Sequence, residues 1–119
     1  MNIAIGNDIV HIPGFKKSLN PAFKARVFTE KEIEQIEEYK ADPAVRYATT
    51  WAAKEAVFKA LRQLQKGSPG LNWKDIEIIR DHKIPSVKIT KSQFKHLFFS
   101  LSLSHHGEYA FAVAIAHAR

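Results

Sequence analysis

The chain has 119 residues, of which 45% are hydrophobic and 25% charged, and it contains no cysteine. This length and composition are typical of one folded domain, so we expect a single domain over residues 1–119 rather than a disordered tail. The lack of cysteine excludes disulfides, thiolate zinc sites and cysteine nucleophiles. No export signal and no bilayer-spanning apolar stretch is visible, which predicts a cytoplasmic protein without a membrane partner.

The formal net charge is +6, from 18 Lys and Arg against 12 Asp and Glu. Such an excess favours nucleic acid, phosphorylated metabolites or acidic proteins as partners. The basic residues are spread along the chain without a long cluster or an aromatic and basic repeat, so nucleic acid is the less favoured partner.

The first predicted element is a strand from Ile3 to Val10 in which side chains alternate between two faces. Asp8 shares its face with the small residues Ala4 and Gly6. We expect these small residues to leave room for a ligand beside the carboxylate. The alternative is a turn at Gly6 that merely exposes Asp8.

Two short helices are predicted next. Asn20-Pro21 is typical of a helix start, and the basic residues around this element are Lys16, Lys17, Lys24 and Arg26. Thr29 and Glu32 have the spacing of a capping box, which predicts a second helix. The glutamates of that helix are expected to form a solvated face.

The longest predicted helix begins at Asp42-Pro43 and runs to about Gln65. Glu55 and Lys59 share one helix face, with alanines one turn away and aromatic residues beside them. Taken alone, the pair is best explained as a surface salt bridge. The apolar surroundings favour a second interpretation, in which both charges belong to a site.

The last part of the chain is predicted to be β structure. Residues 75–80 and 85–90 alternate as strands around a turn, and residues 99–104 and 109–115 form a second hairpin. The order of elements predicts an α+β fold with a largely antiparallel sheet packed against one long helix and shorter helices.

Asp8 and Glu55 are acids within apolar segments, and an ionised carboxylate removed from water needs a partner. If they converge, they could hold one Mg²⁺ while substrate phosphates and water complete its coordination, with Lys59 on a phosphate oxygen. The histidines lack a familiar metal-ligand spacing, and His105 is better suited to a phosphate contact or an exposed hairpin tip. The sequence contains neither a P-loop nor a nucleophile elbow that would make Ser104 a nucleophile.

Four motifs in order make the chain similar to a known family. They are Gly6-Asn-Asp8-Ile-Val, Phe28-Thr-Glu-Lys-Glu32, Trp51-Ala-Ala-Lys-Glu55-Ala-Val-Phe-Lys59-Ala and Ser102-Leu-Ser-His105. Together they resemble the holo-[acyl-carrier-protein] synthases, the small bacterial 4′-phosphopantetheinyl transferases of fatty-acid synthesis, over essentially the whole chain.

The resemblance implies a Mg²⁺-dependent transfer of 4′-phosphopantetheine from coenzyme A to a serine of apo-acyl-carrier protein, releasing adenosine 3′,5′-bisphosphate. It implies Asp8 and Glu55 as magnesium ligands, and Lys59, His105 and Ser104 as coenzyme A contacts. The proton acceptor for the serine stays open between Glu55, Asp8 and a water on the metal.

The resemblance also implies a homotrimer with active sites at subunit boundaries. The acidic carrier protein is expected on the basic surface of Lys16, Lys17, Lys24 and Arg26.

The chain departs from the family pattern at three places. Thr50 stands where an arginine is usual, Gly14 stands where many members have another arginine, and the segment 64–70 replaces a Gly-x-Gly loop. One basic contact is therefore missing or relocated, and Lys66 is the residue expected to compensate. These departures suggest one alternative, a weakened family member. The net charge of +6 suggests another, a non-catalytic basic α+β module that binds nucleic acid or an acidic protein.

Overall fold

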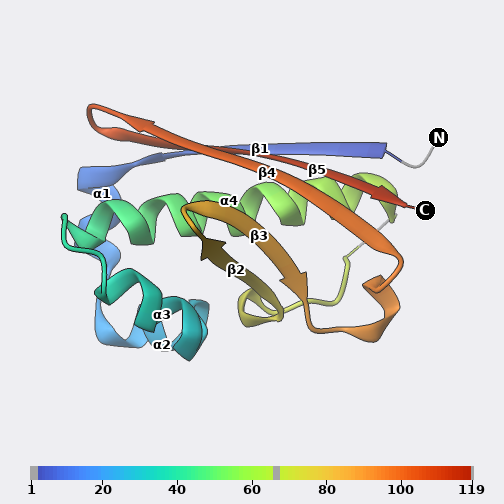
Figure 1. Ribbon diagram of the computed structural model, residues 1–119, viewed down its shortest axis with the longest axis horizontal. Helices are drawn as coiled ribbons and strands as arrows, with labels where there is room; N and C mark the ends of the chain where they lie inside the picture. The colour runs from blue at the N-terminus through green and yellow to red at the C-terminus, as the bar shows by residue number, and fades with distance from the viewer. Residues whose placement is uncertain (1–2, 66–67, 119) are drawn as a thin grey trace.

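A 22-residue helix, α4 (Pro43–Leu64), runs beneath a sheet of long strands, and the shorter elements pack around it (Figure 1). The structure is a computed structural model that describes residues 3–65 and 68–118. The other elements are β1 (Ile3–His11), α1 (Ile12–Ser18), α2 (Pro21–Val27), α3 (Glu30–Glu37), β2 (Ile76–Asp81), β3 (Ile84–Ile89), β4 (Leu97–His106) and β5 (Tyr109–Ala118), with short 3-10 turns at Trp73–Asp75 and Ser92–Phe94.

The strands form two antiparallel sheets. One has the order β1-β5-β4 and the other pairs β2 with β3. In the larger sheet Asp8 is opposite Ala112, which is opposite Leu103. The α+β class, the antiparallel pairing and the single long helix are confirmed, although the expected sheet is divided in two.

Small residues control how closely α4 approaches the larger sheet. A methyl group at Gly6 would collide with the Ala56 carbonyl oxygen and lie 2.7 Å from the Ala60 nitrogen. Ala112 and Ala114 of β5 are also completely buried at this interface. The expectation that small residues leave space for a ligand is therefore wrong at Gly6, because the helix backbone fills that space. The strand is continuous through Gly6, so the alternative of a turn is wrong as well.

Helix starts follow the predicted caps. The Asn20 carboxamide accepts from Phe23 N at 2.8 Å, and the Asp42 carboxylate accepts from Ala44 N at 3.0 Å. Thr29 and Glu32 form the full capping box of α3. These local hydrogen bonds explain why residues close in sequence were sufficient to predict each helix start.

The glutamates of α3 do not all face solvent as expected. Glu32 is completely buried and forms an ion pair of 2.8 Å with the buried Lys54 of α4. Lys54 also donates to the carbonyl oxygens of Trp73 and Ile76, and Glu32 accepts from Ile78 N at 2.7 Å. One charge pair thus ties α3, α4 and β2 together.

The face of the larger sheet turned away from α4 is apolar and exposed. Ile3 and Ile9 of β1 are 60% and 63% exposed, and Tyr109, Phe111 and Ile115 of β5 lie on the same face. The apolar side chains of these strands therefore face outward while alanines face the helix. Within the described residues, no helix combines the length and apolar character needed to cross a bilayer.

Candidate active site

Two carboxylates meet beside the contact between β1 and α4. Asp8 projects from β1 on the helix side of the sheet, and its side chain is 13% exposed. Glu55 of α4 lies within hydrogen-bonding reach of Asp8. Lys59, one turn further along α4, donates to the Asn7 carbonyl oxygen at 2.9 Å and to Asp8 Oδ1 at 3.2 Å. The structure therefore brings the three predicted residues together within one chain.

The surroundings of Glu55 disfavour its charged form. Burial raises the pKa of Glu55, and the nearby Asp8 carboxylate adds to the effect through charge and a hydrogen bond, while Lys59 opposes it. The interpretation of Glu55 and Lys59 as an exposed salt bridge is wrong, because Glu55 is partly buried against Asp8 and the ion pair of Lys59 is with Asp8.

The donor set fits a hard cation. Two carboxylates that face each other supply oxygen ligands and excess negative charge, which a Mg²⁺ ion would neutralise. No cluster of three or more acidic or histidine ligands occurs in the part of the chain that the structure describes. Asp8 and Glu55 would therefore provide only part of the coordination, as expected where substrate phosphates and water provide the rest.

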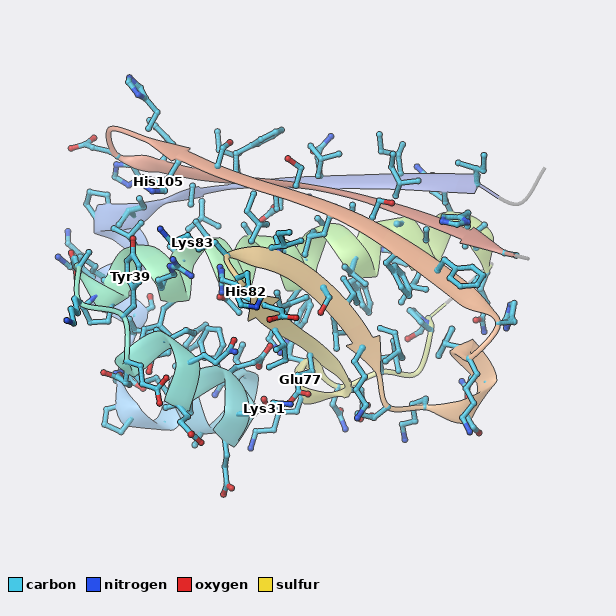
Figure 2. The ribbon with its side chains drawn as sticks, in the orientation of Figure 1. Lys31, Tyr39, Glu77, His82, Lys83 and His105 are labelled. Carbon is cyan, nitrogen blue, oxygen red and sulfur yellow. The ribbon has the colours of Figure 1, made fainter. Side chains whose placement is uncertain are left out.

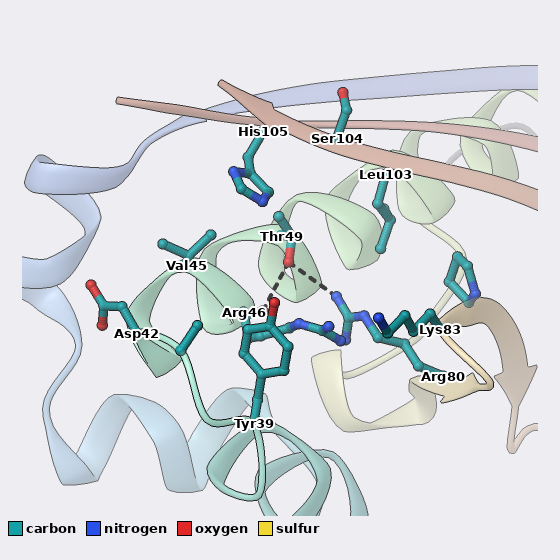
Figure 3. A pocket seen from close by; sticks show the side chains of 12 residues that line it. Tyr39, Asp42, Val45, Arg46, Thr49, Arg80, Lys83, Leu103, Ser104 and His105 are labelled. Carbon is teal, nitrogen blue, oxygen red and sulfur yellow. Dashed lines mark hydrogen bonds between the residues drawn. The ribbon is translucent and has the colours of Figure 1, made fainter. Parts of the chain in front are cut away.

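A basic cavity of about 320 Å³ lies at the N-terminal end of α4. Figure 3 shows its lining residues, which come from α4, the β2–β3 hairpin, β4 and the segment before α4. The residues with cationic or titratable nitrogen groups are Arg46, Arg80, Lys83 and His105. Figure 2 shows Tyr39, Lys83 and His105 at this same end of the molecule.

The two strand-end residues predicted to contact coenzyme A point in different directions. His105 is in register with Ala110 and Val10, so its side chain faces α4 and enters the cavity. Ser104 is one residue earlier, so its hydroxyl points away from the cavity (Figure 3). The structure therefore does not bring the Ser104 hydroxyl to the carboxylates, and Lys66 lies outside the described residues.

His105 and the acid pair lie on the same side of the sheet but on different strands. Asp8 is on β1 and His105 on β4, with β5 between them. Two strand spacings separate β1 from β4, or roughly 10 Å. An extended substrate, rather than a single small group, could contact both regions.

The predicted basic surface is divided between α1 and α2. Lys16 forms an exposed ion pair with Asp42 at 3.3 Å, and Lys24 lies 3.6 Å from Glu37. Arg26 stacks over the Phe23 ring instead. Exposed pairs contribute little to stability, so these lysines can exchange their partners for the carboxylates of another protein.

Sequence reasoning missed the cationic residues Arg46, Arg80 and Lys83. They come from a helix face, a strand and a turn, and no local spacing connects them. Lys83 lies in the left-handed region with φ of 67°, in a hairpin turn that the sequence did predict. Only the packing of the hairpin against α4 gathers these side chains.

Comparison with known proteins shows the family of this chain. Residues 4–114 match the family model described as the 4′-phosphopantetheinyl transferase superfamily. A holo-[acyl-carrier-protein] synthase from Caldanaerobacter subterraneus is 37% identical, in an alignment covering 98% of this chain and 95% of the relative.

Solved structures of holo-[acyl-carrier-protein] synthases have a similar fold. A complex of ACPS with CoA from Chronobacterium ammoniagenes has a TM-score of 0.87 and 28% identity, covering 100% of this chain and 99% of that one. A holo-(acyl-carrier-protein) synthase from Bacillus anthracis, in complex with CoA (3′,5′-ADP), has a TM-score of 0.82 and 29% identity, covering both chains completely. The chain belongs to the holo-[acyl-carrier-protein] synthase family of the 4′-phosphopantetheinyl transferase superfamily.

Proposed function

We propose that this protein transfers 4′-phosphopantetheine from coenzyme A to a serine hydroxyl of apo-acyl-carrier protein, and that the reaction depends on Mg²⁺. The observation that carries the proposal is the meeting of Asp8, Glu55 and Lys59 in a chain of this family. Two adjacent acids with a lysine beside them suit a reaction at a diphosphate, where charge must be neutralised.

Asp8 and Glu55 would hold the metal through carboxylate oxygens. When bound, Mg²⁺ supplies positive charge that stabilises the diphosphate and the leaving group. Lys59 is 51% exposed and already bridges Asn7 and Asp8, so its ammonium group can turn toward a phosphate oxygen while staying close to the acids. His105 and the basic cavity bind the phosphates of the adenosine end of coenzyme A.

The chemistry requires positioning more than covalent help from the protein. The serine oxygen forms a bond to the phosphorus next to the pantetheine arm, and the bond from that phosphorus to the oxygen of adenosine 3′,5′-bisphosphate breaks. The serine proton passes to an acceptor in the same step, for which Asp8 and Glu55 are the candidate side chains of this chain. The enzyme's residues fix the diphosphate and balance its charge, which is the main source of catalysis in phosphoryl-type transfer.

The carrier protein docks on α1 and α2 in this proposal. Lys16, Lys17, Lys24 and Arg26 give this surface a positive charge, and an acidic partner is attracted to it through complementary potential. The effect falls with ionic strength, so the KM for the carrier protein should rise with salt.

The exposed apolar face of the larger sheet is proposed as the contact between copies of the chain in a homotrimer. The isoleucines of β1 and the aromatic residues of β5 form a contiguous apolar surface, which a soluble monomer rarely leaves in water. Sedimentation equilibrium gives the test, and a monomer at micromolar concentration would contradict this assignment.

One assay tests the proposed reaction. The protein is incubated with coenzyme A, Mg²⁺ and apo-acyl-carrier protein, and mass spectrometry is expected to detect one added phosphopantetheine. Glu55→Gln removes a ligand charge with little change of volume, so it is expected to abolish most of the activity while the melting temperature stays near that of the parent.

Absence of any mass gain at millimolar Mg²⁺, combined with salt-sensitive binding to arbitrary DNA, would instead support the non-catalytic basic module. A slow but complete conversion would identify a weakened enzyme.

A further inference from the structure

The basic cavity has a cation that is fixed more firmly than the others. Arg80 extends from β2 toward α4, and its two terminal nitrogens donate to the Thr50 and Thr49 hydroxyl oxygens, each at 3.0 Å. Figure 3 shows the bond to Thr49 and the direction of the guanidinium. These bonds use two of the five N–H donors of the guanidinium, and Arg80 lines the cavity.

The backbone of Arg80 is held as well. The Gln35 side chain of α3 donates to the Arg80 carbonyl oxygen and accepts from Arg80 N, both at 3.0 Å. A single glutamine therefore pairs with this residue as a neighbouring strand would. Because both the backbone and the guanidinium of Arg80 are held, the side chain loses little conformational entropy when it binds a ligand.

No carboxylate forms an ion pair with Arg80, Arg46 or Lys83 among the residues that the structure describes. The acid in the cavity lining, Asp42, pairs with Lys16 and caps α4. Burial, and then the charge of Arg46, lower the pKa of Arg80 to about 10, so Arg80 stays positively charged at neutral pH. The cavity therefore holds fixed positive charge without a matching anion.

A purely structural role does not explain this arrangement. A neutral side chain could bridge two threonine hydroxyls without the cost of removing a cation from water beside another arginine. An anion in the cavity would offset that cost through charge-assisted hydrogen bonds, which are the strong ones for a guanidinium.

Position 50 explains which anion this should be. The resemblance to the family implies an arginine at position 50, directly before the Trp51 motif, whereas this chain has Thr50 there, so one basic contact is expected to be missing or relocated. Thr50 is completely buried, and its hydroxyl is one of the two groups that hold the Arg80 guanidinium. A guanidinium thus lies beside position 50, but it comes from β2 instead of α4.

We propose that Arg80 is a coenzyme A-binding residue that contacts a phosphate group of the substrate, with Thr49, Thr50 and Gln35 as its positioning residues. This inference rests on the proposed function, because it takes coenzyme A as the occupant of the cavity. It also assigns the relocated contact to Arg80, a residue of the described chain, rather than to Lys66.

The first experiment measures coenzyme A binding by calorimetry and kcat and KM by the mass assay. Arg80→Gln keeps a polar side chain but shortens it and removes the charge, and it is expected to raise the Kd and KM for coenzyme A at least about tenfold. Arg62→Gln, on the exposed end of α4, is the matched control and should leave both values within about twofold. Unchanged coenzyme A affinity in Arg80→Gln would overturn the inference.

The second experiment moves the arginine. Arg80→Thr alone should bind coenzyme A weakly, and adding Thr50→Arg should restore most of the affinity, because the guanidinium returns to the same cavity from α4. A structural role of Arg80 predicts no such rescue, so a folded double variant that binds no better than Arg80→Thr overturns the inference. If the double variant does not fold, the comparison of Arg80→Gln with Arg62→Gln decides.

Dephospho-coenzyme A distinguishes the two phosphate sources. If Arg80 contacts the ribose phosphate, Arg80→Gln and the parent bind this analogue equally; if Arg80 contacts the diphosphate, the difference persists. Both results support the inference. Failure of the proposed function is recognised separately, because the parent protein would then bind no coenzyme A and modify no carrier protein.

Discussion

Breaking the buried ion pair between Glu32 and Lys54 should destabilise the protein more than any exposed charge substitution. Both side chains are fully buried. In Lys54→Met, the Glu32 carboxylate stays buried without its counter-charge, and the Trp73 and Ile76 carbonyl oxygens lose a donor. Removing one partner of such a pair costs about 3–5 kcal/mol. For a domain of this size the loss corresponds to a fall in melting temperature of roughly 10 °C or more.

Urea unfolding at a fixed protein concentration measures this loss. Trp51 and Trp73 have ring centroids 4.7 Å apart, and Trp73 supplies one of the carbonyls that bind Lys54, so tryptophan fluorescence reports on the region. Lys16→Met, which breaks the exposed pair with Asp42, is the control and should cost less than about 1 kcal/mol.

A double-mutant cycle separates the ion pair from general disruption. Glu32→Gln combined with Lys54→Met leaves no buried charge, and the glutamine oxygen can still accept from a backbone N–H. The double variant should therefore be more stable than the sum of the single losses predicts, by about 1 kcal/mol or more. Strict additivity, or a loss below about 1 kcal/mol in Lys54→Met, would refute this account of the pair.

Three further predictions follow from single contacts. Gly6→Ala should destabilise the protein by about 1–3 kcal/mol, because the added methyl group would force β1 away from the Ala56 carbonyl. An unchanged urea midpoint would contradict the close packing of β1 on α4. Lys59→Ala should lower kcat/KM for coenzyme A with little effect on unfolding, and equal coenzyme A kinetics would remove Lys59 from the site. Burial and the Glu37 hydrogen bond raise the pKa of Tyr47 above its ordinary 10.0, so the folded state keeps a proton that the unfolded state loses. The stability contribution of Tyr47 is therefore complete below about pH 10 and is lost as the pH rises further, and this loss of stability should be smaller in Tyr47→Phe. An absorbance titration at 295 nm in which Tyr47 ionises together with the exposed tyrosines would contradict this prediction.

Local signals in the sequence determined much of the fold. The caps at Asn20, Thr29 and Asp42 predicted the helix starts because their hydrogen bonds join residues two or three positions apart. Period-two alternation predicted the strands, and the ordered motifs predicted the family. The same motifs predicted that Asp8, Glu55 and Lys59 belong to one site, and the structure places the three side chains next to one another.

Tertiary structure decided which partner each charged group has. Glu55 faces Asp8 because β1 packs on α4, and Glu32 faces Lys54 because α3 packs on α4. The first pair is separated by 47 positions in the sequence and the second by 22, so packing alone brings them together. Alternation showed two faces in each strand but could not show that the alanines, rather than the isoleucines, face the helix. Arg80 lies beside Thr50 for the same reason: a contact between a strand and a helix 30 residues apart depends on packing, which leaves no local pattern in the sequence.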